Sequence, residues 1–243
     1  VYKRQLMYPL TMARDILNVY ADVIQTGPRE LEMSCNSIIM PGGGKGFINL
    51  SAFYTGDPAE GEKILAPIRA IGKPMLDDIK VGKYLDIQSR IDRNVPWGNH
   101  YYQKAGMLTE LKPELIDLLI DITKESWPIQ TAVNFTQVGG AINDLDMGAT
   151  AYPNRNAEVQ MILSGSWPKQ RDDQGDLIAG IRGNWKKLVP FTDGVYINNM
   201  FNDDGDQRVV DNWNKNYTRL VELKNQYDPM NLLRLNANIK PTV

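Results

Sequence analysis

Few side chains in this 243-residue sequence are suited to acid–base, nucleophilic or metal chemistry on their own. His100 is the single histidine and Cys35 the single cysteine. A Ser-His-Asp triad needs a histidine with two partners, and zinc sites draw their ligands from several Cys and His residues. The composition therefore argues against both kinds of site and against an internal disulfide. It favours a buried, inert thiol for Cys35 and a packing or surface role for His100, in an aromatic-rich turn.

Two further patterns resemble binding loops but have the wrong spacing. Residues 42–46 (Gly-Gly-Gly-Lys-Gly) lack the spacing of a phosphate-binding loop and precede a strand pattern, so they predict a hairpin turn. The acidic clusters 172–176 and 202–206 lack the glutamate and ligand spacing of an EF-hand. They predict solvated turns that cap the helices after them. No metal site is predicted.

The overall composition is that of a globular protein, with 42% hydrophobic and 23% charged residues. The formal net charge of -2 provides no basic face for phosphates, so a nucleic-acid partner is not expected. The sequence has no uncharged apolar run of about 18 residues, so no membrane association is expected. Because it begins at Val1 without an initiator methionine or a signal-peptide pattern, we interpret it as a later part of a longer polypeptide.

Hydrophobic periodicity predicts the elements that would have to position a site. The order of helices and strands does not alternate as in a Rossmann fold. It predicts an α+β fold in which helices pack on one face of an antiparallel sheet. Helices are predicted at 10–23, 57–71, 112–126, 176–188 and 206–227, with short helical pieces at 75–83. Strands are predicted at 32–40, 47–54, 130–138, 158–166 and 195–201.

The end of the chain carries the most specific motif. Residues 216–220 read Asn-Tyr-Thr-Arg-Leu, residues 227–229 read Tyr-Asp-Pro, and residues 231–239 read Asn-Leu-Leu-Arg-Leu-Asn-Ala-Asn-Ile. This ending resembles that of the berberine bridge enzyme family, which reads roughly N-Y-x-R-L, Y-D-P and N-L-F-R-x-N-x-N-I-x-P. The main departure is Leu233 where phenylalanine is usual. Weaker matches follow in the expected order upstream, at 54–57, 65–68, 88, 101–104, 139–141, 149–155 and 194–198.

The resemblance implies an FAD-linked oxidoreductase of which this chain is the later part. It implies that residues 1–190 form the substrate-binding domain, in agreement with the antiparallel sheet predicted from periodicity. Residues 191–243 would form the C-terminal segment, whose last helix and tail return to an N-terminal FAD-binding domain missing from this sequence. The implied partners are that domain, a small organic substrate and molecular oxygen.

The resemblance also implies positions for the catalytic groups. The family carries an acid/base or orienting group, often glutamate, at the position of Gln160, and often a tyrosine base at the position of Asn199. Amides do not titrate near neutral pH, so neither residue can serve as the base. Either another tyrosine (Tyr152, Tyr196 or Tyr102) serves instead, or the base lies in the missing domain. Ordinary strand polarity is the alternative explanation for Gln160 and Asn199.

Four residues near the end of the chain are implied to contact the flavin. They are Tyr196, Asn198, Asn236 and Asn238. Side-chain amides at such positions can hydrogen-bond the flavin or the backbone. Cys35 and His100 do not match the motifs that tether flavin covalently in many members.

The predicted function is therefore FAD-dependent transfer of a hydride from an alcohol, sugar or similar small organic substrate to flavin. The isolated chain is expected to be inactive and to bind FAD weakly or not at all. Two alternatives remain. One is a catalytically inert flavin- or ligand-binding remnant of the same fold, suggested by the two amides. The other is an α+β ligand-binding domain unrelated to flavins.

Overall fold

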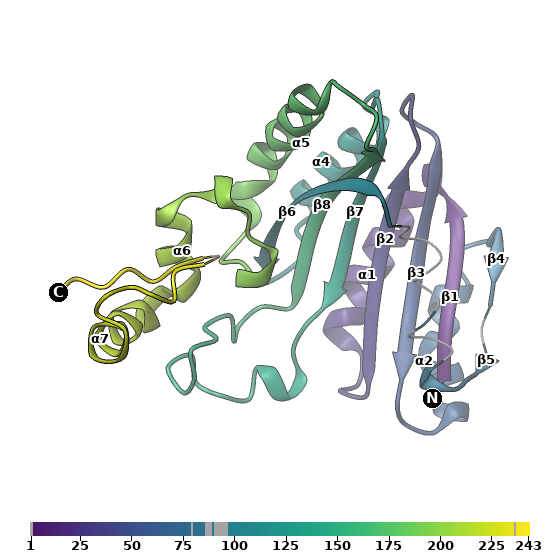
Figure 1. Ribbon diagram of the computed structural model, residues 1–243. Coiled ribbons are helices and arrows are strands. Elements are labelled where there is room, and N and C mark those ends of the chain that lie inside the picture. The colour runs from purple at the N-terminus through teal and green to yellow at the C-terminus, as the bar shows by residue number, and fades with distance from the viewer. Residues whose placement is uncertain (1, 79, 86–88, 90–96, 236) are drawn as a thin grey trace.

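A single antiparallel sheet forms the centre of the protein (Figure 1). The computed structural model describes residues 2–78, 80–85, 89, 97–235 and 237–243. Seven of its eight described strands have the order β4-β1-β3-β2-β7-β8-β6, and the eighth, β5, pairs with β1. The strands are β1 (Tyr2–Pro9), β2 (Leu31–Ile39), β3 (Gly46–Tyr54), β4 (Leu76–Asp77), β5 (Lys80–Val81), β6 (Asn99–Leu108), β7 (Gln130–Gln137) and β8 (Val159–Pro168).

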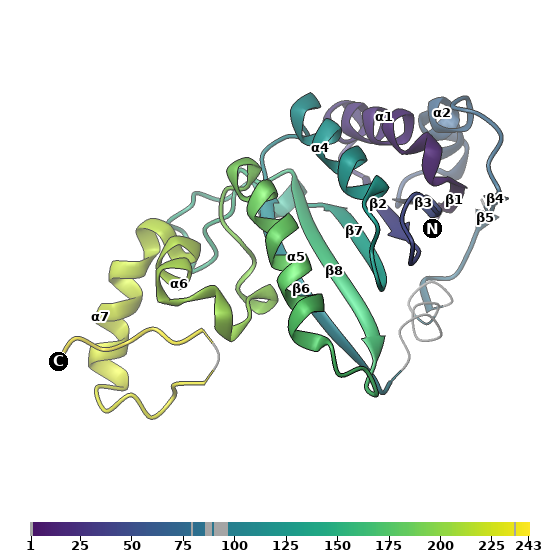
Figure 2. The same cartoon turned by 90° about the horizontal axis from the view of Figure 1, so that it is seen from above.

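Among the described residues, four helices cover one face of the sheet, and two further helices lie beyond its β6 edge (Figures 1 and 2). The covering helices are α1 (Ala13–Thr26), α2 (Pro58–Arg69), α4 (Pro113–Lys124) and α5 (Gln174–Leu188). The outlying helices are α6 (Asp206–Trp213) and α7 (Tyr217–Tyr227). Short 3-10 turns are η1 (Leu10–Met12), η3 (Gly140–Ile142), η4 (Val189–Phe191), η5 (Ile197–Asn199), η6 (Asn202–Asp204) and η7 (Asn214–Asn216). No described helix is both long and apolar enough to cross a bilayer.

Alternation along the strands separates a buried face from an open one. In β2 the side chains of Met33, Cys35, Ser37 and Ile39 are buried, while those of Ser34, Asn36 and Ile38 between them remain partly exposed. β8 repeats the pattern over its whole length. Cys35 is fully buried, as predicted, and burial raises the pKa of its thiol far above its usual range, which disfavours the reactive thiolate. The core therefore lies between the sheet and the helices, and the opposite face, which carries both polar and apolar side chains, is left partly exposed.

The glycine-rich segment is a hairpin turn, as predicted. β2 and β3 pair without interruption from Leu31 opposite Tyr54 to Ile39 opposite Gly46. Gly43 has φ 73°, and a Cβ there would lie 2.3 Å from the carbonyl oxygen of Glu125, so only glycine fits. The neighbouring Gly44 N–H donates to the Thr123 carbonyl in the last turn of α4 (3.2 Å), and the Gly42 N–H donates to the Trp127 carbonyl just beyond that helix (2.9 Å). They are therefore not free to cradle a phosphate.

The predicted α+β class is correct, and most element boundaries agree within a few residues. β1 and β6 were not predicted, however. His100 was expected in a turn but lies in β6, where its ring is 6.3 Å from that of Trp167. The short helical pieces expected at 75–83 are also wrong for the residues described, because β4 and β5 lie there and pair with β1.

Two expectations near the C-terminus are also corrected. The strand predicted at 195–201 is a turn, in which Asn199 N–H donates to the Tyr196 carbonyl (2.8 Å) and Met200 N–H to that of Ile197 (3.1 Å). The helix predicted at 206–227 is divided into α6 and α7. It breaks at Asn214, whose φ of 46° is not helical.

Candidate functional site

Gln160 lies on the open face of the sheet. Its neighbours in register are Thr136 on β7 and Met107 on β6. The side chain is partly exposed and, within the part of the chain described, makes no hydrogen bond. The amide is therefore available to a ligand on this face.

The segment that follows α5 extends the sheet at the β6 edge. Met107 N–H donates to the Gly194 carbonyl (3.0 Å), and Asp193 N–H donates to the Met107 carbonyl (2.8 Å). Gly194 has φ 81°, and a Cβ there would lie 2.3 Å from Asn154 Oδ1. The buried Asn154 amide donates to the Val195 carbonyl (3.0 Å). Backbone pairing and this amide together fix the turn that carries Tyr196, Asn198 and Asn199.

Asn199 also reaches the open face, at a different point. Its Oδ1 accepts a hydrogen bond from Gln103 Nε2 at 3.3 Å, and Gln103 pairs with Ser164 on β8. Gln160 lies four residues from Ser164 along the same strand, a separation of about 13 Å. The structure thus places both predicted residues on one face without bringing them into contact.

Tyr152 and Tyr196 lie close together beside this turn. Burial raises the pKa of Tyr152, and nearby Tyr196 adds to the shift. Arg155, whose guanidinium is 4.9 Å from the Tyr152 ring centroid, and a hydrogen bond with Asn154 act in the opposite direction but are outweighed. Tyr152 is therefore protonated near neutral pH in this chain and is not poised as a general base. Tyr196 is 38% exposed, and its hydroxyl accepts a hydrogen bond from Asn198 Nδ2 at 2.7 Å.

A cavity of about 400 Å³ lies between this turn and the C-terminal tail. Asn198 and Asn238 both contribute to it, together with apolar groups such as Ile197 and Leu235. The Asn238 Oδ1 atom is buried and has no hydrogen-bond partner among the described residues. Because buried polar atoms are normally paired, this oxygen is suited to accept a hydrogen bond from a ligand N–H or O–H. Asn236, the fourth predicted flavin contact, lies outside the described residues.

The cavity fits part of a flavin in its chemistry. An isoalloxazine ring has apolar faces and a polar edge that carries both an N–H donor and carbonyl acceptors. Apolar groups beside two amides, one with an unpaired acceptor, complement such a ring. No group of three or more Cys, His, Asp or Glu side chains in the described chain is arranged to hold a metal ion.

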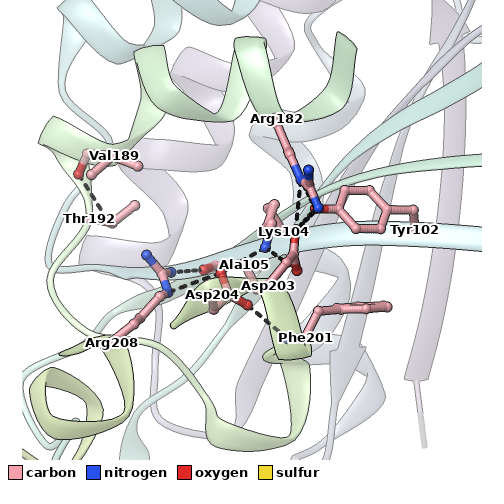
Figure 3. A network of polar contacts seen from close by, with 10 residues as sticks. All are labelled: Tyr102, Lys104, Ala105, Arg182, Val189, Thr192, Phe201, Asp203, Asp204 and Arg208. Atoms are coloured by element: carbon pink, nitrogen blue, oxygen red, sulfur yellow. Dashed lines mark hydrogen bonds and ion pairs between the residues drawn. The ribbon is translucent and has the colours of Figure 1, made fainter. Parts of the chain in front are cut away.

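A buried ion-pair network holds the C-terminal segment against β6 (Figure 3). Lys104 is 5% exposed, and its Nζ lies 2.9 Å from Asp203 Oδ1 and 2.8 Å from Asp204 Oδ1. Asp203 Oδ2 accepts hydrogen bonds from the Tyr102 hydroxyl (2.5 Å) and Arg182 Nε (2.7 Å). The network thus joins β6, α5 and η6 beside the candidate site.

Further bonds complete the attachment to β6. Asp204 Oδ2 accepts from the Phe201 N–H at 2.8 Å, and the Phe201 ring lies 5.2 Å from that of Tyr102. Arg208 donates to the Ala105 carbonyl at 2.6 Å (Figure 3).

The network corrects the interpretation of the acidic cluster at 202–206 as a solvated turn. Burial alone would raise the pKa of Asp203, but hydrogen bonds from Tyr102, Lys104 and Arg182 outweigh it and lower the pKa from 3.8 to about 2. One sequence signal for the network was available. Lys104 is flanked by Gln103 and the apolar run Ala105–Leu108, so a strand would turn this lysine toward the buried face, where it would need an acidic partner.

The family model described as "Berberine and berberine like" matches residues 195–240. The resemblance predicted from the C-terminal motif is therefore confirmed.

Similar proteins point to the same class. An FAD-linked oxidoreductase of Dictyostelium discoideum is 27% identical to the chain, over 99% of this chain and 52% of that protein. An FAD-linked oxidoreductase of Bacillus subtilis (strain 168) is 24% identical, over 81% of this chain and 45% of that protein. The chain thus spans about half the length of the curated relatives it matches.

Solved structures share the fold. Aclacinomycin oxidoreductase superposes with a TM-score of 0.84 at 17% identity, over 99% of this chain and 55% of that one. A chitooligosaccharide oxidase gives a TM-score of 0.78 at 18% identity, over 100% and 56%. These likenesses establish the fold alone. The division at residue 190 and the roles of the site residues remain predictions.

Proposed function

We propose that this chain supplies the substrate-binding sheet and the C-terminal, flavin-contacting segment of an FAD-dependent oxidoreductase. The reaction is transfer of a hydride from a C–H bond of an alcohol, sugar or similar small organic molecule to flavin. Molecular oxygen is the proposed final electron acceptor. The observation that carries the proposal is the cavity between the turn at Ile197–Asn199 and the C-terminal tail, with the unpaired Asn238 acceptor in its wall.

In this proposal the chain's own residues bind and orient, while FAD supplies the hydride acceptor when bound. Tyr196, Asn198 and Asn238 would hold the flavin. Gln160 and Asn199 would orient the substrate through amide hydrogen bonds, since amides can both donate and accept. The base that removes a substrate proton would then be Tyr152 or a residue outside this chain.

Exposed apolar residues near the C-terminus support the presence of a further domain. Leu232, Leu233 and Leu235 are each at least 79% exposed. A run of this kind is unfavourable in water and is usual where another surface covers it. The FAD-binding domain is the proposed cover.

A catalytically inert remnant is the second candidate. The observations that favour it are the amides at Gln160 and Asn199, which do not titrate near neutral pH, and the raised pKa of Tyr152. Flavin binding without flavin reduction would support this candidate.

The test uses the polypeptide expressed together with its upstream sequence. Flavin content is measured by absorbance, and reduction by bleaching of the oxidised flavin band on anaerobic mixing with alcohols and sugars. Asn238→Ala should lower flavin content, whereas Asn18→Ala, on the exposed side of α1, should not. A full-length protein without flavin would refute the proposal. Tight stoichiometric binding of FAD by residues 1–243 alone would refute the need for another domain.

A further inference from the structure

The connection between β7 and β8 is long and carries Tyr152. Residues 138–158 project beyond the ends of both strands (Figure 1), and the turn η3 is the helical structure described within them. Connections of this length with so little secondary structure are uncommon in compact domains and are often functional. The side chains that bond the backbone of this connection therefore determine where Tyr152 lies.

Asn216 gathers three carbonyl groups of this connection around one amide. Its Nδ2 atom lies 2.8 Å from the carbonyl oxygen of Met147, 3.0 Å from that of Thr150 and 3.3 Å from that of Ala151. The two N–H groups of the amide are thus shared among three acceptors. Ala151 immediately precedes Tyr152, so the amide fixes the stretch of backbone that leads into the tyrosine.

Helix capping does not explain the position of Asn216. The residue stands at the N-terminal end of α7, where an asparagine usually accepts a hydrogen bond from an N–H group of the first turn. Its side chain makes no such bond. The amide donates instead to backbone that lies 65 to 69 residues earlier in the chain. The side chain is therefore oriented toward the connection rather than toward its own helix.

Arg155 holds the other side of Tyr152. Its guanidinium donates to the Ile142 carbonyl at 2.7 Å and to the Thr150 hydroxyl at 2.5 Å. The same guanidinium lies 4.9 Å from the centroid of the Tyr152 ring. Thr150 is thus bonded twice, by Arg155 through its hydroxyl and by Asn216 through its carbonyl. The tyrosine is therefore held between two anchors.

Helix α7 connects the Asn216 anchor to the candidate flavin cavity. Near the other end of the helix, Asn225 Nδ2 donates to the Thr242 hydroxyl at 2.9 Å, and Asn225 Oδ1 accepts from the Thr242 N–H at 2.8 Å. The tail held in this way carries Asn238, whose unpaired oxygen lies in the cavity wall. One helix therefore joins the connection between β7 and β8 to the segment proposed to hold the flavin.

We propose that Asn216 is a positioning residue that sets the Tyr152 side chain relative to the flavin cavity. The proposal rests on the proposed function and takes Tyr152, rather than a residue outside this chain, as the reacting side chain. Asn216 touches neither substrate nor flavin and acts through the backbone of residues 147–151.

The test uses the full-length, flavin-containing protein. Asn216→Leu keeps the branching of the side chain but removes the donor, and Asn18→Leu, at an exposed position of α1, is the matched control. Asn216→Leu should lower kcat about 10-fold, equivalent to about 1.4 kcal/mol, the size of one hydrogen bond. KM and flavin content should change less than about 2-fold, because ground-state binding is not affected. Asn216→Ser, whose hydroxyl donates a single hydrogen bond, should give an intermediate kcat.

Tyr152→Phe shows whether Asn216 acts through the tyrosine. In a chain that already carries Tyr152→Phe, Asn216→Leu should lower kcat less than about 2-fold further. A residue that only stabilises the fold would lower kcat by the same factor in both backgrounds. Equal factors, or an unchanged kcat for Tyr152→Phe alone, would overturn the inference while flavin reduction still supports the proposed function.

The ionisation of Tyr152 provides a readout that does not depend on turnover. Burial raises the pKa of Tyr152, and nearby Tyr196 adds to the shift. Arg155 and a hydrogen bond with Asn154 oppose it. Asn216→Leu should release the tyrosine from this environment and lower its pKa toward the ordinary value. The ultraviolet absorbance of tyrosinate measures the change, at pH values where circular dichroism shows an intact fold, and Tyr152→Phe assigns the signal.

This titration also separates the inference from the proposed function. If the full-length protein contains no flavin, or no substrate reduces it, the proposed function fails. A lowered pKa of Tyr152 in Asn216→Leu would then still support the positioning role, and an unchanged pKa would overturn it.

Discussion

Replacing Lys104 by methionine isolates the energetic role of the buried network. Methionine keeps the apolar stem but removes the ammonium group from between Asp203 and Asp204, 2.9 and 2.8 Å away. Both carboxylates are mostly shielded from water, with Asp204 only 7% exposed. Breaking one side of a buried pair typically costs about 3–5 kcal/mol, because the remaining charge is left uncompensated. For a chain of this size, that corresponds to a fall in melting temperature of roughly 6–20 °C.

Lys124→Met is the matched control. Lys124 also forms an ion pair, with Asp121, but its side chain is 67% exposed. Exposed pairs of this type contribute about 0.5 kcal/mol or less. Urea unfolding followed by circular dichroism should therefore separate the two variants by at least about 2 kcal/mol, with unchanged slopes.

The double variant Lys104→Met/Asp204→Asn tests the cause. If the cost arises from an unpaired buried carboxylate, neutralising Asp204 should recover part of the loss. If Lys104→Met unfolds with the same free energy as Lys124→Met, the carboxylates are solvated and the reasoning is wrong.

Three other predictions concern stability and reactivity. The pKa of the Asp203 carboxylate is lowered from 3.8 to about 2, so this group should contribute about 2 kcal/mol to the free energy of unfolding. This contribution is fully present above the pKa of the group in the unfolded chain and is lost as pH falls through about 2. Unfolding free energies of Asp203→Asn and the unsubstituted protein should accordingly differ near neutral pH and converge near pH 2; a constant difference would contradict the assignment. Gly194→Ala should lower the free energy of unfolding by at least about 2 kcal/mol, because the residue has a positive φ and a Cβ there would clash with Asn154. Gly183→Ala, in open space on α5, should raise it by about 0.5–1 kcal/mol. Thermal melts that rank the two variants otherwise would contradict the geometry of these two positions. The Cys35 thiol, fully buried and with a raised pKa, should react with a chromogenic disulfide reagent only at the rate of unfolding, and rapid reaction in native buffer would show that it is accessible.

The sequence was sufficient to predict elements whose contacts join residues close together in the chain. β2 and β3 are adjacent in the chain, alternate strictly and are joined by glycines at positive φ, so their pairing could be predicted from sequence. The Asp57 cap of α2 is equally local: its Oδ1 accepts from the N–H groups two and three residues later.

The elements that the sequence did not predict depend on contacts with residues far away in the chain. β6 carries a lysine on its buried face, which is compatible with a strand only because Asp203 and Asp204 meet it from 99 and 100 residues away. Seen alone, those aspartates have the composition of a solvated turn. The strand predicted at 195–201 failed for a related reason: its apolar residues are held by Gly194 and Asn154 as a turn beside β6.

The edge of the sheet at β6 has a consequence for solubility. β6 is ten residues long and is the last strand in the sheet, so its outer backbone groups would be a template for another chain. Here the C-terminal end of that edge is occupied: residues 193 and 194 bond to Met107, and Arg208 bonds to the Ala105 carbonyl. A chain cut after Pro190 would lose all of these bonds and leave the strand bare. The C-terminal segment thus protects this strand edge from self-association and also lines the candidate site, so truncation removes both roles together.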